Sequence, residues 1–233
     1  MLEFKSKSFS VTVFEKAKSV GGRVATRRFQ EKFVNHGIEN LSQFSRLNLD
    51  PVYQQYKHQF TSGNRATDLP KAMAAANSDH SILFEKRISD INELDGYDAI
   101  IMTQPIPQVI EILGPVNSLD AISYSKKILF IGLHHGETVR LELSDESSSE
   151  LFDLPEATIR QKASLILDTD LSQLDLKKWR YSRVVNGMPV SFLEINPRCF
   201  IAGDAFDPIG DFDLSSAWIS GREVARHIIS KFS

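Results

Sequence analysis

The sequence predicts an α/β fold, in which a doubly wound, Rossmann-like domain is assembled from both ends of the chain around an inserted antiparallel-sheet domain. Two observations support this prediction. Short apolar strands followed by turns lie near both ends of the chain, and a strongly periodic helix comes last. Longer strands that suit antiparallel pairing lie between them.

The composition is that of an ordinary globular protein, with 42% hydrophobic and 24% charged residues among 233. The formal net charge is −3 and there is no basic stripe, so no nucleic-acid partner is expected. The single cysteine, Cys199, favours a reducing compartment, and no apolar run reaches the roughly 18 residues that span a membrane. We therefore expect a cytoplasmic protein without a membrane partner.

The first elements in chain order are a helix end and a strand. Residues 1–7 place lysines after apolar residues, as near a helix C-terminus. Residues 8–14 are rich in β-branched and aromatic side chains and predict a buried strand that ends at Glu15. Residues 50–60, which start with Asp–Pro, and the alanine-rich residues 67–77 predict two helices.

The middle of the chain predicts a change from parallel to antiparallel strands. Residues 82–84 and 87–91 suit a hairpin or two short strands, whereas residues 98–103 have the continuous apolar centre of a parallel strand. Pro105 then opens a helix. Further along, 127–133 and 138–143 are expected to pair antiparallel, 144–150 to form a solvated loop and 179–185 to form another strand.

The C-terminal segment predicts a short buried strand over residues 198–202 and a long helix after it, for which Asp213 is a suitable N-cap. The apolar residues that share one face of this helix are Leu214, Ala217, Trp218, Gly221, Ala225 and Ile228.

The turn after the first strand carries residue types that suit a dinucleotide. A carboxylate such as Glu15 at a strand end can accept hydrogen bonds from ribose hydroxyls. The paired glycines Gly21 and Gly22 let the backbone approach a pyrophosphate, and Arg23 offers a fork of donors. A surface turn with a solvated Arg23 explains the same residues equally well.

A second candidate lies where the strand over 198–202 runs into Gly203 and Asp204. The helix that begins near Asp213 would direct its N-terminus at the same crevice, where the macrodipole favours a negative atom such as those of a reduced flavin. The alternative is a capped helix that packs on the core. The aspartates between 204 and 213 do not match a calcium loop, so no metal site is expected.

Taken in order, several segments resemble the flavin-containing amine oxidases, and most closely their renalase-like branch. Residues 11–28 (VTVFEKAKSVGGRVATRR) resemble the second half of the FAD fingerprint, and 97–113 resemble the strand and Pro-x-Pro turn that follow the inserted sheet. Residues 119–133, 177–184 and 199–225 are similar to the start of the substrate domain, its Trp-Arg-Tyr strand and the C-terminal flavin-binding segment.

The resemblance implies a role for each matching residue on the adenosine side of FAD. Glu15 would bind the adenosine ribose. Gly21, Gly22 and Arg23 would line the pyrophosphate and the ribityl side. Ile88 would sit on a strand that contacts the adenine.

The resemblance also implies where the flavin would lie. Gly203 and Asp204 would hold the ribityl–pyrophosphate region, and Phe212 and Asp213 would lie under the isoalloxazine. Two further residues, His36 and Trp179, would face the flavin ring and the substrate.

The implied activity is removal of a hydride from an amine or a dihydronicotinamide-type substrate, such as NAD(P)H or an isomer, with electrons passed from FAD to oxygen. The alternative is a degenerate, non-catalytic member of the family that has lost FAD and acts as a binding or scaffold protein. The substrate and the catalytic residues are not identified by the sequence.

One departure from the family is serious, because the sequence contains no Gly-x-Gly-x-x-Gly turn. That turn and its strand normally precede the acidic residue by about 20 positions, and Glu15 lies too near Met1 to allow this. A longer functional chain, a degenerate member, or another segment in the central strand position would each account for it. We expect an exposed apolar groove beside the strand at 10–14, which would favour dimers.

The expected domain boundaries follow from this order. Residues 1–40, 68–115 and 196–233 form the predicted FAD-binding domain, and 41–67 and 116–195 form the predicted substrate domain.

Overall fold

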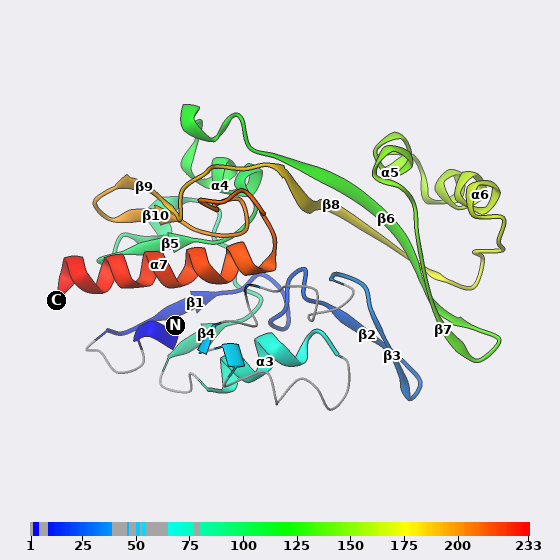
Figure 1. The fold of residues 1–233 in the computed structure, drawn as a ribbon, viewed down its shortest axis with the longest axis horizontal. Coiled ribbons are helices and arrows are strands. Elements are labelled where there is room, and N and C mark those ends of the chain that lie inside the picture. The colour runs from blue at the N-terminus through cyan, green and yellow to red at the C-terminus, as the bar shows by residue number, and fades with distance from the viewer. Residues whose placement is uncertain are drawn as a thin grey trace.

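The computed structural model describes residues 2–4, 9–38, 46, 50–51, 53–54, 65–76 and 80–233. Within these residues the chain forms a mixed α/β fold with both parallel and antiparallel strands (Figure 1). No helix in the described part of the chain is long and apolar enough to cross a membrane. Most of the predicted helix at 50–60 lies outside the described residues.

The short parallel strands lie in two separate sheets. The strand β1 (Thr12–Phe14) pairs in parallel with β4 (Ser81–Leu83). The strand β5 (Ile100–Met102) pairs in parallel with β10 (Cys199–Ile201), which also pairs antiparallel with β9 (Leu193–Asn196). Both parallel pairs join segments far apart in sequence, as expected for a doubly wound fold.

The prediction of strand structure at 87–91 is wrong. Because β4 pairs with β1, it has no hairpin partner after it, and the chain continues without strand structure into the 3-10 helix η3 (Ile91–Leu94). A capping box fixes the start of η3, since Asp90 accepts from Asn92 N and Glu93 accepts from the backbone of Asp90.

Helices cover both faces of the parallel strands, and the predicted positions of three of them are confirmed. The first is α3 (Asp68–Ala75), which begins after Thr67. Pro105 opens α4 (Ile106–Leu113). The longest is α7 (Leu214–Phe232), which Asp213 caps by accepting from Ser216 N.

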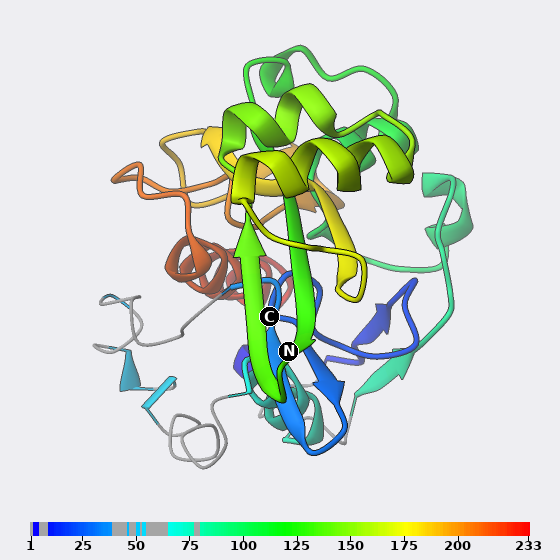
Figure 2. The same cartoon turned by 90° about the vertical axis from the view of Figure 1, so that its right-hand side faces the viewer.

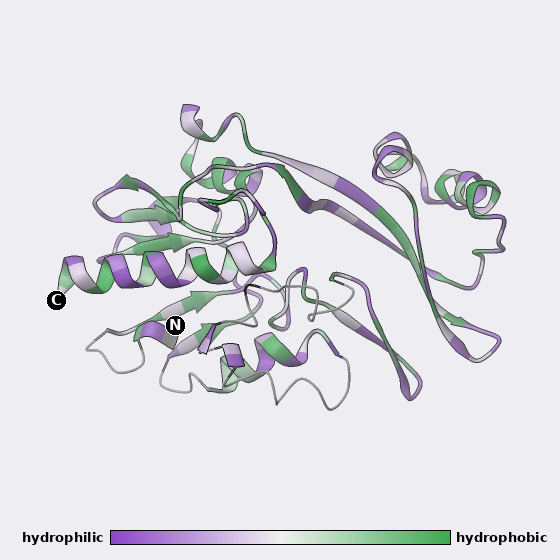
Figure 3. Ribbon diagram, viewed as in Figure 1, coloured by the Kyte–Doolittle hydropathy of each residue, from purple (hydrophilic) through white to green (hydrophobic). Residues whose placement is uncertain are grey.

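The apolar side chains of β5 and β10 alternate between two clusters. Ile100 and Met102 pack with α4, whereas Ile101 and Phe200 pack with α7. These strands are coloured mainly hydrophobic in Figure 3, and hydrophilic and hydrophobic segments alternate along α7. Both faces of the sheet are therefore buried, as parallel sheets require. Two 3-10 turns, η1 (Leu2–Phe4) and η4 (Asn117–Leu119), complete this part of the chain.

The other part of the fold is a long antiparallel ribbon. The predicted pairing of β6 (Ser123–His134) with β7 (Glu137–Glu142) is confirmed, and β8 (Asp175–Asn186) pairs with the other edge of β6. The turn between β6 and β7 has two residues, His135 and Gly136, and both have positive φ. That geometry matches the twist of the strands.

Two helices pack on this ribbon, and the prediction of a solvated loop at 144–150 is wrong (Figure 2). The helix α5 (Asp145–Leu151) begins at Ser144, whose side chain accepts from Ser147 N. Ser148 is fully buried, and its Oγ accepts from Ile128 N of β6. The neighbouring helix is α6 (Glu156–Leu167).

A hairpin that was not predicted joins the two parts. The strands β2 (Thr26–Phe29) and β3 (Lys32–Asn35) pair antiparallel. Val34 of β3 packs against Leu129, Ile131 and Trp179 of the ribbon. The turn at 21–25, which carries Arg23, is therefore anchored to both parts of the fold.

Candidate functional site

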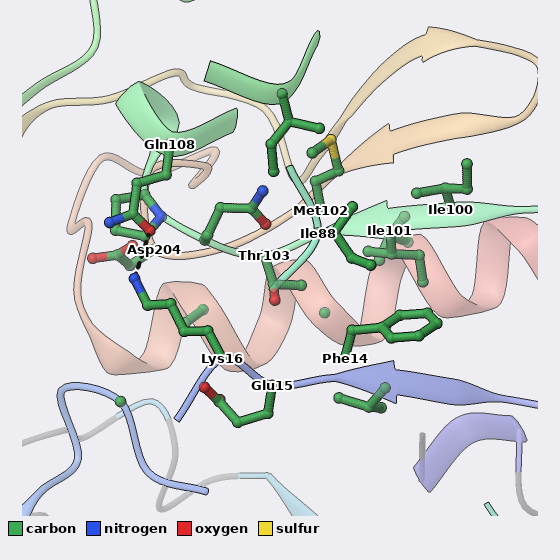
Figure 4. A pocket seen from close by; sticks show the side chains of 18 of the residues that line it. Phe14, Glu15, Lys16, Ile88, Ile100, Ile101, Met102, Thr103, Gln108 and Asp204 are labelled. Carbon is green, nitrogen blue, oxygen red and sulfur yellow. Dashed lines mark hydrogen bonds between the residues drawn. The ribbon is translucent and has the colours of Figure 1, made fainter. Parts of the chain in front are cut away.

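A large cleft separates β1 from β5 (Figure 4). Its volume is about 2270 Å³, well above the roughly 300–1,000 Å³ of an ordinary small-molecule site. Among the described residues no strand lies between β1 and β5, so the predicted groove beside the first strand is confirmed.

Most of the predicted site residues line this one cleft. They are Glu15, Gly21, Gly22, Arg23, Ile88, Trp179, Asp204, Phe212 and Asp213. His36 and Gly203 are not among the lining residues. Ile88 is not on a strand as predicted, because the chain leaves β4 before it, but it packs with the apolar cluster under α4.

Glu15 lies at the carboxyl end of β1, where doubly wound folds bind their ligands. Its backbone N–H still donates to Leu83 O at 2.9 Å, so β4 fixes its position. Its Oε1 accepts from Ala17 N at 2.8 Å. The next residue, Lys16, extends across the mouth of the cleft and donates from Nζ to Gln108 of α4 at 3.3 Å (Figure 4).

The turn that follows depends on its glycines. Gly21 and Gly22 have φ of 142° and 52°, values that other residues rarely adopt. The turn is closed by Val24 N, which donates to Gly21 O at 2.8 Å. This turn brings the Arg23 side chain to the cleft.

Arg23 is bound to Asp204 across 181 positions of sequence. Its Nη1 donates to Asp204 Oδ2 at 2.7 Å and to Ser182 O at 3.3 Å. Burial lowers the pKa of Arg23, but the hydrogen bond and charge of Asp204 outweigh it and raise that pKa above its ordinary value. The solvated Arg23 of the alternative interpretation is therefore not what the structure shows.

Gly203 supports Asp204 from the end of β10. Its φ of 150° requires glycine, and its N–H donates to Ser220 Oγ of α7 at 2.9 Å. Tyr124 lies near Arg23 and Asp204 and was missed by sequence reasoning. Its Oη accepts a hydrogen bond from Ile106 N at 3.1 Å. Burial, partly offset by that bond, raises the pKa of Tyr124 to about 12.

Phe212 and Asp213 shape the start of α7 at the cleft. Phe212 has a left-handed φ of 49°, and a Cβ on Gly187 would overlap its ring. Gly187 is therefore needed for this contact, which the sequence did not signal. Asp213 acts as the helix N-cap, so its carboxylate is engaged by the helix itself.

His36 and Trp179, both expected to face the flavin ring and the substrate, lie against each other. Their rings stack with centroids 5.7 Å apart and 28° between planes, and Trp179 Nε1 donates to His36 O at 2.9 Å. Only Trp179 reaches the cleft. Burial, together with the charges of Lys177, Arg27 and Arg140, lowers the pKa of His36 from 6.5 to about 4.

The lowered pKa of His36 predicts how the stability of the fold depends on pH. Between pH 6.5 and about 4 the unfolded chain binds a proton at His36 that the folded chain does not, so stability should fall as pH falls through this window. His36→Gln should flatten this part of the pH profile, measured by urea unfolding, whereas exposed His134→Gln should leave it unchanged. Equal profiles for wild type and His36→Gln would contradict the prediction.

A second polar network, also missed by sequence reasoning, anchors the loop before α7. Asp207 is 1% exposed, and its carboxylate accepts hydrogen bonds from both Nη1 and Nη2 of Arg46. It also accepts from Ser216 Oγ and Ile209 N. Burial raises the pKa of Asp207, but these bonds outweigh burial and leave that pKa below its ordinary value.

Comparison with known families bears on the first part of this site. Residues 3–56 match the family model of an NAD(P)-binding Rossmann-like domain. Residues 3–56 are therefore similar to a Rossmann-like domain of the kind that binds dinucleotides. The match supports a place in the broad family of FAD- and NAD(P)-dependent oxidoreductases. No curated protein matches the chain.

The residues of the cleft fit part of a dinucleotide. An acidic residue at the carboxyl end of β1 and a turn with two positive-φ glycines suit a ribose and its phosphate. The phosphate cradle of a Gly-x-Gly-x-x-Gly turn is absent from the sequence. Among the described residues, no three His, Cys, Asp or Glu side chains gather as a metal site needs.

Proposed function

We propose that this protein is an FAD-dependent oxidoreductase of the renalase-like amine-oxidase type. Its substrate would be an amine or a dihydronicotinamide such as NAD(P)H or an isomer, and oxygen would accept the electrons. One observation carries the proposal: Glu15, the Arg23–Asp204 pair and Trp179 come from distant segments and open onto one cleft at the carboxyl ends of parallel strands.

The proposal gives each residue a binding or positioning role. Glu15 binds the adenosine ribose through its carboxylate. Gly21 and Gly22 bring backbone close to the phosphates, and the Arg23–Asp204 pair fixes the wall beside the ribityl chain. Bound FAD would supply the hydride chemistry.

The flavin side of the proposal rests on the start of α7. Phe212 and Asp213 would hold the flavin ring from the start of α7. Trp179, whose Nε1 donates to the His36 carbonyl oxygen, would exclude water from the substrate side.

The proposal also covers the organisation of the chain. Residues 1–40, 68–115 and 196–233 form the FAD-binding domain, and 41–67 and 116–195 form the substrate domain. The protein acts in the cytoplasm on a small-molecule hydride donor.

The second candidate is a binding protein of the same fold that does not hold FAD. The missing Gly-x-Gly-x-x-Gly turn favours it, because that turn normally contacts the pyrophosphate. The two candidates differ in a simple property, which is whether the purified chain retains a flavin.

Replacing Glu15 tests the proposed function. Glu15→Gln should weaken FAD binding about 10- to 150-fold, the effect of losing one charge-assisted hydrogen bond. Flavin absorbance retained after gel filtration measures it. Exposed Glu31→Gln is the control and should bind like wild type. A wild-type chain that retains no flavin would reject FAD and favour the second candidate.

A further inference from the structure

The side chain of Arg140 on β7 has buried donors without an acceptor. Its Nη2 donates to Gly37 O at 3.2 Å and to Glu142 Oε1. Its Nε and Nη1 are buried, and no described residue accepts a hydrogen bond from either. Because nearly all buried polar groups of folded proteins have a partner, unmatched donors of this kind indicate a water or an ion from outside the chain.

His36 lies in the same layer, between the hairpin and the ribbon. Its ring stacks on Trp179 and does not line the cleft. Its Nδ1 is also buried without a partner in the described part of the chain. The charges of Lys177, Arg27 and Arg140 act on this ring from β8, β2 and β7. The function proposed above uses none of these three cations.

The layer has more positive than negative charge. Asp175 Oδ2 lies 3.4 Å from both Arg27 Nη2 and Lys177 Nζ, so one carboxylate serves two cations. Glu142 is the carboxylate that pairs with Arg140. Three cations therefore share two carboxylates. Since charges withdrawn from water need partners, the layer can accept one further negative charge.

A cavity beside Arg140 has room for that charge. It lies between β3 and β7, where the hairpin runs beside the ribbon (Figure 1), and its volume is about 180 Å³. A single water needs only roughly 10–15 Å³ of such space, so the cavity admits a molecule of several heavy atoms. Its lining is half apolar and half polar, and consists of Phe33, Val34, Asn35, Thr138, Val139 and Arg140.

We propose that this cavity binds a short-chain carboxylate, with the carboxylate group on Arg140 and the hydrocarbon chain against the apolar side of the cavity. Phe33, Val34 and Val139 form that side. Arginine pairs with carboxylates through charge-assisted hydrogen bonds, and Thr138 adds a hydroxyl donor to the lining. The guanidinium turns toward the cavity on binding, because both of its unpaired N–H groups are covered in the structure.

The charge and the lining of the cavity select a carboxylate over a phosphate. A phosphate dianion exceeds the single unpaired charge of the layer, and the apolar half of the lining has nothing to contact on it. The proposal does not depend on FAD, since the cavity and the cleft have no lining residue in common.

Butyrate is the probe that tests the site, and butyramide is its uncharged control. The Arg140 Nε–H signal of the ¹⁵N-labelled full chain is followed by NMR at neutral pH and constant ionic strength. Butyrate at up to about 10 mM, tenfold above a Kd of about 1 mM, should shift this signal along a saturable curve. Butyramide should bind about tenfold or more weakly, as for one lost charge-assisted hydrogen bond.

Two glutamine variants make the test specific. Arg140→Gln should weaken butyrate binding about tenfold or more, measured from the backbone N–H signal of Thr138. Arg183 lies on the same ribbon, where it pairs with Asp145 and is 69% exposed. Arg183→Gln should therefore bind butyrate like wild type. Circular dichroism checks that both variants fold.

Three outcomes would overturn the proposal. The first is no saturable shift of the Arg140 signal at the highest butyrate concentration, which would mean that water alone fills the cavity. The second is equal binding of butyrate and butyramide. The third is tighter binding of inorganic phosphate than of butyrate, which would assign the cavity to another anion. Titrations of the wild-type chain decide all three, so a variant that fails to fold does not affect them.

Discussion

Replacing Asp207 by alanine is expected to lower the free energy of unfolding by about 3–5 kcal/mol, because it removes the only buried carboxylate that contacts the partly buried Arg46 in the described part of the chain. Asp207 is 1% exposed and accepts hydrogen bonds from Arg46, Ser216 and Ile209, so its removal takes an acceptor from three donors at once. Urea unfolding followed by circular dichroism measures the loss.

The control for this prediction is Asp211, which contacts the same arginine at 3.2 Å but is 53% exposed. Asp211→Ala should cost at most about 1 kcal/mol, as for a surface ion pair. The Asp207 contribution is present above its ordinary pKa of 3.8 and is lost as pH falls through its lower folded pKa. Equal losses for the two alanine variants would refute the assignment.

Replacing Gly37 by alanine is expected to cost about 3 kcal/mol or more, at the upper end for added volume. A Cβ at this position would overlap the Arg23 carbonyl oxygen and lie 3.1 Å from Ala25 N. The two segments are held together by Ile38 N to Arg23 O and His36 N to Ala25 O, both 2.9 Å, so neither can move aside without losing a bond.

The same substitution should disturb the site, because the Gly37 contact positions the turn that carries Arg23. Thermal and urea unfolding measure the change in stability. FAD binding measures the disturbance of the turn that carries Arg23. Gly96→Ala is the control, since nothing lies within 4 Å of the Cβ that it would add. Its effect should stay within about 0.5 kcal/mol. A Gly37→Ala variant as stable as Gly96→Ala would contradict the predicted close approach.

The elements of the fold that carry strong local signals could be predicted from the sequence. Asp213 before an apolar stripe predicted α7, and Pro105 predicted α4, because caps act within a few residues. The run at 144–150 has no apolar period, and its helix is stabilised by Ser148, which bonds to a strand. Tertiary contact, which local propensity does not encode, decides that segment.

Most of the residues singled out from the sequence line one cleft, but the contacts between them could not be predicted. The spacing of Glu15, Gly21 and Gly22 after a strand predicted where a dinucleotide segment lies. Nothing in the sequence pairs Arg23 with Asp204, since the two are joined only when both ends of the chain meet. The role of Gly187 depends on the Phe212 ring in the same way.

The parallel pairing of β5 with β10 also affects how the protein is made. Ile100 cannot pair with Cys199 until the ribosome has translated the 99 residues that follow Ile100. At the usual rate of about 5–20 residues per second, the intervening stretch takes roughly 5–20 s to synthesise. During that interval β5 is an apolar strand without the partner that completes its sheet, so this sheet forms late and β5 needs protection from aggregation until then.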